Sequence, residues 1–410
     1  MPTTLRRAAT LAAAILPALA IAEPLSFEQA LSLAAQRSEA ARAGRASATS
    51  AYETARAAGQ LPDPMLRAGI DNLPVTGADR FSTSRESMTM KRVGISQEWL
   101  SADKRAARGQ AARAVARREA LQAAVAEGEA RLQVTLAYLD AWYADAALAL
   151  TLQTERQRHE ALEAAHARLA AAAGAAAEVL QLDAAQGIAE DDSEEARQQQ
   201  AAARVGLQRW VGFLPDALTS VPTFAVPAEA DYLSRHPRLL ALQRDVDVAR
   251  GAAAVAAQAR TPNWTWEVSY GQRNGAADLV SVGVSIPLQV APSRRQDRDT
   301  AAKLALIERT EAELAEAARA ATADYRALAS DVDRLQRRIE RYRTSVVTPA
   351  QQRTALALAA YRSNQGSLAP VFEARDAEVQ AQRRLLTLQR DLAKAQAQLA
   401  FKPLARGVAP

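Results

Sequence analysis

The chain of 410 residues carries 51 lysines and arginines against 46 aspartates and glutamates, so its formal net charge is only +5, and 49% of it is hydrophobic. This composition allows a large buried core and argues against disorder, and the small net charge gives little support to nucleic-acid binding, which we do not expect. The sequence has no cysteine and three histidines, which excludes zinc–thiolate sites and cysteine nucleophiles and disfavours histidine-based catalysis. We therefore expect no enzyme, no catalytic residues, no cofactor and no bound metal.

The N-terminus has the pattern of a secretory signal peptide over residues 1–22. Arg6 and Arg7 precede an apolar stretch that ends in the small residues Ala20 and Ala22. This apolar stretch is too short to cross a membrane as a helix. The pattern predicts that the protein is exported.

The rest of the chain contains an internal repeat, with two similar copies in tandem. The segment Val93-Gly94-Ile95-Ser96 is echoed by Val282-Gly283-Val284-Ser285, and Tyr138 is echoed by Tyr325. A proline-rich connector separates the two copies. We expect a first repeat at 23–212, a connector at 213–237 and a second repeat at 238–410, with β hairpins at about 63–100 and 262–290 and long helices at about 103–212 and 297–400.

The helical segments show a heptad rhythm, with apolar or small residues at alternating spacings of four and three. In the first half this stripe comprises Leu121, Val125, Gly128, Leu132, Thr135, Leu139, Trp142, Ala146 and Ala149. In the second half it comprises Leu314, Ala318, Ala321, Tyr325, Leu328, Val332, Leu335, Ile339, Tyr342 and Val346. Such stripes predict helices of up to about 100 Å that pack at a shallow angle as in a coiled coil.

The β segments alternate with a period of two. From Trp264 to Tyr270 and from Val280 to Leu288 every second residue is apolar, and Asn274-Gly275 between them favours a hairpin turn. Met65 to Asn72 and Met88 to Trp99 alternate less regularly. Lengths of about ten residues are typical of membrane-spanning strands; the alternative is a soluble hairpin packed on helices.

The strand count constrains the assembly. Two hairpins supply four strands, which cannot close a membrane barrel, and lipid does not tolerate an open sheet edge. Two copies would give a barrel filled by side chains, whereas three copies would leave a lumen. If these strands span a membrane, we expect a homotrimer.

In this order of elements the chain resembles the TolC-type outer-membrane efflux channels, from about Leu25 to Pro403. Two local pieces carry the resemblance, the N-terminal Leu25-Ser26-Phe27-Glu28-Gln29-Ala30-Leu31 and the segment from Tyr361 to Ala374. The loop Leu61-Pro62-Asp63-Pro64-Met65 with Asp71-Asn72-Leu73-Pro74 is similar to the branch that is paired with heavy-metal cation pumps.

The resemblance implies a mainly α-helical trimer, in which long helical hairpins form a periplasmic tunnel that continues into a twelve-stranded β-barrel in the outer membrane. The implied function is that of the exit duct of a tripartite efflux system. Its partners would be a periplasmic adaptor (membrane fusion) protein, an inner-membrane resistance–nodulation–division pump and outer-membrane lipids. A periplasmic adaptor and a coiled-coil envelope scaffold are the alternatives.

The resemblance also implies three groups of functional residues. The helix tips that contact the adaptor comprise Leu169, Gly174, Tyr361, Arg362, Ser363, Asn364, Gly366, Ser367 and Leu368. An acidic ring at the tunnel entrance comprises Glu178, Asp183, Glu373 and Asp376; acids in the first turn of a helix can instead complement its dipole. Basic residues at the membrane boundary comprise Lys104, Arg105, Arg294 and Arg295, for which a solvated helix face is the alternative.

The histidines and methionines of this sequence, residue types that bind metals in other proteins, are not spaced to form a metal site. His159 and His166 are seven residues apart, about two helical turns, which is too far for one ion. The two thioethers of Met88 and Met90 are a poor basis for a soft-metal site.

Overall fold

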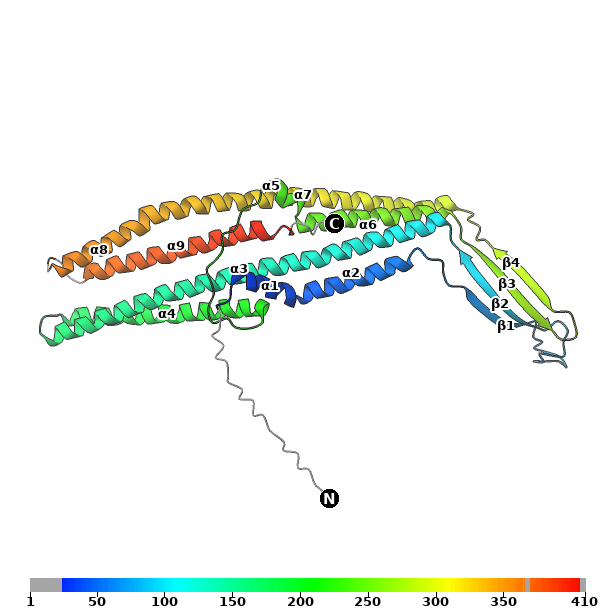
Figure 1. Ribbon diagram of the computed structural model, residues 1–410, viewed down its shortest axis with the longest axis horizontal. Coiled ribbons are helices and arrows are strands. Elements are labelled where there is room, and N and C mark those ends of the chain that lie inside the picture. The colour runs from blue at the N-terminus through cyan, green and yellow to red at the C-terminus, as the bar shows by residue number, and fades with distance from the viewer. Residues whose placement is uncertain (1–23, 364, 366–368, 406–410) are drawn as a thin grey trace, which may run out of the picture.

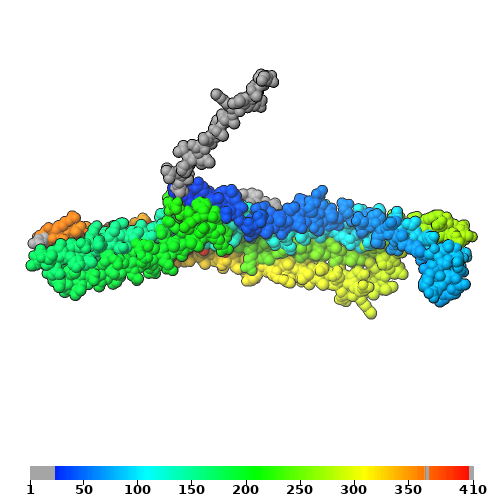
Figure 2. Space-filling view, turned by 90° about the horizontal axis from the view of Figure 1, so that it is seen from below, coloured from blue at the N-terminus to red at the C-terminus, as the bar shows by residue number. Residues whose placement is uncertain are grey.

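The computed structural model describes residues 24–363, 365 and 369–405, so the signal peptide expected at residues 1–22 lies outside the described residues. The molecule is a long, narrow bundle of helices with a β-sheet at one end (Figure 1), and a space-filling view shows the N-terminal helices along one long side (Figure 2). The elements of the first half are α1 (Phe27–Arg37), α2 (Glu39–Ala57), β1 (Met65–Asp71), β2 (Met90–Trp99), α3 (Ala102–Ala170) and α4 (Ala176–Val211). Those of the second half are α5 (Glu229–Ser234), α6 (Pro237–Ala257), β3 (Trp264–Arg273), β4 (Leu279–Ser285), α7 (Gln296–Tyr342), α8 (Thr348–Arg362) and α9 (Ala369–Phe401).

The strands of the described residues form one antiparallel sheet in the order β1-β2-β3-β4. The two hairpins therefore lie side by side, because β2 also pairs with β3 and places Val93 opposite Tyr270. The alternation in the sequence predicts that β4 continues to Leu288, but the strand ends at Ser285. Pro287 explains the earlier end, since a proline has no N–H to donate to the ladder.

Local sequence determines where the longest helix pair begins and ends. The Oγ of Ser101 accepts a hydrogen bond from the backbone N–H of Lys104 (3.2 Å) and caps α3. Gly212, with φ of +92°, ends α4 in the left-handed conformation that a glycine adopts without strain. The 69 residues of α3 span about 100 Å at 1.5 Å per residue, as the heptad stripe predicts.

The second half departs from a continuous helix. A π-helical segment, Arg343–Val347, separates α7 from α8 just before Pro349, whose missing N–H breaks the regular hydrogen-bond ladder. The wider turn rotates the buried face by one position, so Val347 is buried and Val346 is exposed. The heptad prediction was wrong at Val346 for this reason.

The main core lies about halfway along the bundle, where the connector crosses from one half to the other (Figure 1). Phe27 packs edge-on against Tyr138 and Phe224, with ring centroids 5.5 and 5.6 Å apart. The Tyr138 hydroxyl lies 3.0 Å from the backbone oxygens of both Leu25 and Thr219. Tyr138 therefore fastens the segment before α1, at Leu25, and the connecting segment, at Thr219, to α3.

Among the described residues, none of the helices combines the length and the apolar character that crossing a lipid bilayer requires.

A buried histidine at the start of α6 predicts a dependence of stability on pH. The His236 side chain packs beside Tyr232, is 5% exposed, and neither ring nitrogen has a hydrogen-bond partner in the described residues. Burial lowers the pKa of His236 to about 4, and the charges of Lys402 and Arg238 lower it further, whereas Asp324 opposes the shift. Between pH 6.5 and pH 4 the unfolded chain therefore binds more protons than the folded chain does.

We expect the protein to be most stable above pH 6.5 and to lose on the order of 2 kcal/mol of unfolding free energy as the pH falls toward 4 through this histidine. Carboxylates titrate over the same range, so the measurement compares the melting temperature of the protein with that of His236→Leu from pH 7.5 to 4.5. The variant should lose less stability on acidification. Equal losses in both proteins would contradict the assignment.

Candidate functional site

The register of the sheet sorts its residues onto two faces, because directly opposite residues point to the same side. The first face is apolar apart from Lys91, Gln97 and Gln272 near the strand ends. It comprises Leu66, Ala68, Ile70, Val93, Ile95, Trp99, Trp264, Trp266, Val268, Tyr270, Val280, Val282 and Val284. The second face carries charged, hydroxyl and glycine residues, with two methionines and Leu279 near the strand ends. It comprises Met65, Arg67, Gly69, Asp71, Met90, Arg92, Gly94, Ser96, Glu98, Thr265, Glu267, Ser269, Gly271, Arg273, Leu279, Ser281, Gly283 and Ser285.

The sheet is unfinished in the single chain. In the described residues β1 and β4 are each paired along one side only, and their apolar side chains, such as Leu66 and Val282, are exposed. A row of unpaired N–H and C=O groups is a template for pairing with another strand. In a lipid environment such an edge must be paired.

The turn between α3 and α4 and the end of α8 lie together at the end of the molecule farthest from the sheet (Figure 1). In the first hairpin Leu169 is exposed, and a Cβ at Gly174 would lie 2.9 Å from the Leu169 nitrogen, so the turn has no room for a larger residue. Arg168 binds Glu178 across this turn (2.6 Å) and approaches the Tyr361 hydroxyl of the second hairpin (3.5 Å).

In the second helical hairpin, formed by α8 and α9, α8 ends at Arg362, and Ser363 follows it as the C-cap residue. Tyr361 is half-buried, whereas Arg362 and Ser363 are exposed. The other predicted tip residues of this turn, Asn364, Gly366, Ser367 and Leu368, lie outside the described residues.

The acidic residues predicted to form a ring differ in their surroundings. Glu178 is paired with Arg168, and Asp376 forms an ion pair with Arg158. Glu373 is exposed at 3.9 Å from Arg353, and Asp183 is exposed on α4. A negative field at this end would therefore come mainly from Asp183, and from Glu373, whose arginine is farther away than those of the other two acids.

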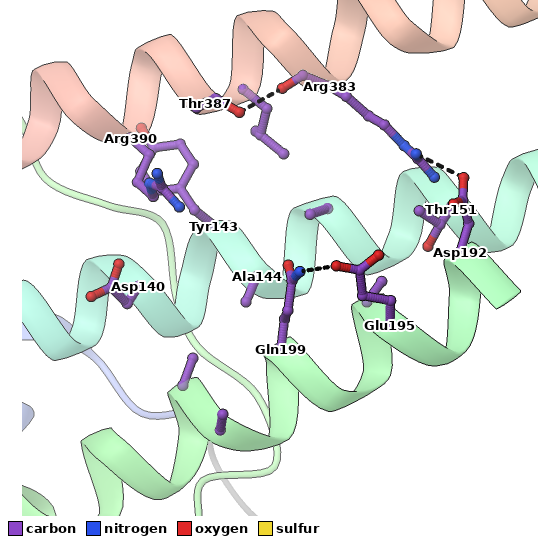
Figure 3. A pocket seen from close by; sticks show the side chains of 15 residues that line it. Asp140, Tyr143, Ala144, Thr151, Asp192, Glu195, Gln199, Arg383, Thr387 and Arg390 are labelled. Carbon is purple, nitrogen blue, oxygen red and sulfur yellow. Dashed lines mark hydrogen bonds and ion pairs between the residues drawn. The ribbon is translucent and has the colours of Figure 1, made fainter.

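A charged groove, with a volume of about 550 Å³, runs between α4 and α9 along α3 (Figure 3). Its lining includes Asp192 and Glu195 of α4 and Arg383 and Arg390 of α9. Arg383 binds Asp192 at 2.9 Å across the groove. Together with the pair of Arg158 and Asp376, this contact ties the second hairpin to the first.

The basic residues at the sheet end of the helices also differ from one another. Lys104 is only 9% exposed, and its ammonium donates hydrogen bonds to the Thr261 carbonyl and to Asn263 Oδ1, both at 2.7 Å. Burial lowers the pKa of Lys104, as does the charge of Arg108, while Glu98 opposes the shift. Lys104 thus joins the two repeats and does not project outward, whereas Arg105 is half-buried and Arg294 and Arg295 are exposed.

The described residues contain no group of three or more histidine, aspartate or glutamate side chains that could hold a metal ion. His159 and His166 are both exposed on α3. Met88 is exposed, and the Met90 side chain lies over Gly271.

No model of a protein family matches the sequence, and neither does any curated protein. Solved structures do match over almost the whole chain. The outer membrane protein VceC of Vibrio cholerae has a TM-score of 0.74 at 17% identity, over 92% of this chain and 96% of VceC. The CmeC outer membrane channel of Campylobacter jejuni has a TM-score of 0.77 at 10% identity, over 93% of this chain and 87% of CmeC.

A third match is CusC, whose structures are described in terms of folding and transmembrane channel formation. It has a TM-score of 0.74 at 16% identity, over 92% of this chain and 91% of CusC. Identities this low establish the fold alone. The chain therefore has the fold of the TolC-type outer-membrane channels, as its sequence resemblance predicts.

Proposed function

We propose that the chain is the outer-membrane exit duct of a tripartite efflux system and that three copies form one duct. The observation that carries the proposal is the sheet, with one apolar face, one polar face and two unpaired edges. Pairing β1 of each copy with β4 of the next would satisfy both edges. Three copies of the four-stranded sheet give twelve strands, wide enough to leave a water-filled lumen.

In this arrangement the apolar face contacts lipid and the polar face lines the lumen. The tryptophans Trp99 and Trp264 pack against each other in a tilted arrangement at the helix end of the sheet, with ring centroids 5.9 Å apart, where an interfacial aromatic girdle belongs. Arg294 and Arg295, exposed just beyond the sheet, are placed to meet acidic headgroups of outer-membrane lipids, as is Arg105.

The long helices continue the duct into the periplasm. The recurring order of strands and long helical hairpins supports the two-repeat division at the connector, and three copies of two repeats give approximate sixfold symmetry to the far end. We propose that the tips around Gly174 and Tyr361 contact a periplasmic adaptor and, through it, an inner-membrane pump of the resistance–nodulation–division type. The exposed carboxylates of Glu373 and Asp183 would then give the entrance a negative field that favours cations.

The proposal assigns no reaction to the chain, because a duct supplies a path and the pump supplies the energy. Heavy-metal cations are the substrate class favoured by the resemblance of the loop from Leu61 to Met65. Deleting the gene should sensitise cells to the exported solutes, and a panel of metal salts and drugs identifies their class. Unchanged tolerance to the whole panel, or recovery of the protein in the soluble periplasm without detergent, would contradict the proposal.

A substitution in the first helix tip tests the tip separately from the rest of the duct. Gly174→Val should abolish complementation of the deletion strain, because the added side chain cannot fit against Leu169 in the turn. The main core and the sheet are far from this turn (Figure 1), so the oligomer in the membrane should persist.

The matched control is Gly187→Val on α4, where an added Cβ meets nothing within 4 Å. This control should complement the deletion as the wild type does. Full tolerance in cells that carry Gly174→Val would show that this turn is not the coupling site.

A further inference from the structure

The polar face of the sheet carries a connected set of charges at its centre. Arg67 of β1 lies 3.3 Å from Glu267 of β3, Arg92 of β2 lies 3.9 Å from the same carboxylate, and Arg92 also pairs with Asp71 of β1. Two arginines thus face two carboxylates on each chain. The set (Arg67, Asp71, Arg92 and Glu267) is referred to below as the belt.

Glycines make these contacts geometrically accessible. Arg67 lies opposite Gly94, which has no side chain to block its path across β2 to Glu267 on β3. Arg92 lies between Gly69 and Gly271 on the neighbouring strands. Gly94 and Gly69 therefore leave the two arginines room to extend over β1 and β2, whereas the Met90 side chain fills the space over Gly271 on the β3 side of Arg92.

Burial of the hydroxyl residues agrees with this arrangement. Ser96 and Ser269 are only 1% and 3% exposed and lie on the same face of the sheet as the belt. Ser96 lies directly opposite Glu267, and the belt side chains, which are 27% to 57% exposed, are far more open than these two serines. The belt is thus the solvent-facing surface of this part of the sheet.

The remaining charges on this face lie at its ends and have other partners. Glu98 accepts a hydrogen bond from Asn263 at the helix end (2.6 Å), and Arg273 donates to the Ala277 carbonyl at the turn (3.1 Å). The belt residues themselves are partly exposed, with Arg67 the most open of them. Partly hydrated ion pairs are weak, so passing ions can compete for them.

We propose that the belt is a charge-balanced exchange site on the lumen wall, which exchanges its ion pairs with charged groups on passing solutes and admits cations and anions alike. The inference rests on the proposed duct, since only a sheet closed around a lumen presents this face to solutes. Removing one carboxylate leaves one excess positive charge per chain, and removing one arginine leaves one excess negative charge. Three copies around one lumen add their fields.

The cysteine-free sequence allows a direct measurement. Ser281 lies on the polar face of β4, opposite Ser269, and is exposed. In Ser281→Cys, the thiol reacts with methanethiosulfonate reagents that carry either a trimethylammonium or a sulfonate group. The ratio of the two rates, on the purified detergent-solubilised oligomer at low salt, reports the local potential.

With the belt intact we expect the ratio to be close to that of a free thiol. Adding Glu267→Gln should lower the ratio of cationic to anionic labelling by about three- to tenfold, adding Arg92→Gln should raise it by a similar factor, and 1 M salt should suppress both shifts. The matched control is Lys91→Gln. Lys91 is next to Arg92 on β2 but lies on the apolar face of the sheet, so this variant also removes one positive charge and should leave the ratio unchanged.

The outcomes separate the belt from the duct. Efficient labelling at position 281 with the same ratio in the Glu267→Gln and Arg92→Gln backgrounds would overturn the belt and leave the duct intact. If one belt variant fails to assemble, the other still decides the question, because the two shifts have opposite signs. Labelling of Val282→Cys on the apolar face, with none at position 281, would overturn the assignment of the two faces and with it the proposed duct.

Discussion

Gly94→Val should prevent assembly of the sheet and remove nearly all folded protein from the membrane. A Cβ at position 94 would lie 2.6 Å from the Ser269 Cβ and 2.9 Å from the Val268 carbonyl oxygen, both on the adjoining strand β3. Neither atom belongs to the end of a flexible side chain, so the two central strands would have to separate. Overpacking that displaces backbone costs several kcal/mol, and the expected loss of assembled protein is tenfold or more, as an order-of-magnitude estimate.

The sequence repeat supplies a matched control. Gly283 is the counterpart of Gly94 in the second repeat and points to the same face, but an added Cβ there meets nothing within 4 Å. Gly283→Val should assemble as the wild type does, because β-branched residues suit strands. Heat-resistant oligomer on gels of outer-membrane fractions reports the result, and equal amounts for both variants would contradict the packing described for β2 and β3.

Tyr138→Ala should cost about 3–5 kcal/mol of stability. The side chain is fully buried, packs against Phe27, and reaches the backbone oxygens of Leu25 and Thr219 with its hydroxyl. The alanine variant loses both the ring contacts and the donor. Tyr138→Phe keeps the ring, so it should cost only about 1–3 kcal/mol, for the carbonyls that lose their donor.

The melting temperature of the solubilised oligomer measures both losses. The control is Tyr52→Ala, because Tyr52 is exposed on α2 and its removal should change stability by less than about 0.5 kcal/mol. A melting temperature for Tyr138→Ala within error of that of Tyr52→Ala would show that the N-terminus and the connector are not held by this residue.

Features that depend on sequence neighbours were predictable. Alternation with a period of two located the strands, because it reflects which side of a sheet each residue faces. Heptad spacing located the long helices for the corresponding reason. The repeat also matched two residues with similar contacts. Tyr138 binds the connecting segment at Thr219, and the Tyr325 hydroxyl donates to the Pro227 carbonyl of the same segment (2.8 Å).

Features that depend on distant parts of the chain were not predictable. The repeat aligns Gly94 with Gly283, but one lies in a central strand and the other in an edge strand, so they have opposite packing environments. The pairing of Arg383 with Asp192 joins residues that are 191 positions apart. The basic residues around Lys104 are typical of an exposed helix face. The burial of Lys104 against Thr261 follows only from the pairing of β2 with β3.

One missed feature did leave a mark in the sequence. Pro349 interrupts an otherwise helical pattern and coincides with the π-helical segment that precedes α8. A proline just after a heptad stripe indicates a local change of helical register near the end of the stripe. From this proline the heptad stripe could have been predicted to end at Tyr342, before Val346.

The central claim is that the unpaired edges β1 and β4 meet between copies. Within one chain, three strand spacings, about 14 Å, separate β1 from β4, which exceeds the Cα separation of about 7 Å that a disulfide can bridge. A cysteine at Ala68 on β1 can therefore bond only to the β4 of another copy. Combining it with a cysteine at Val280, Val282 or Val284 samples the registers that place both residues on the apolar face.

Oxidising these double-cysteine variants in outer-membrane fractions, followed by electrophoresis without reductant, is the most direct measurement. At least one pair should give covalent dimers and trimers, with no larger species, because a closed ring of three has no free edge. The same variants should stay monomeric on reducing gels. Only monomers with every pair, or a ladder that continues past three chains, would contradict the closed trimer.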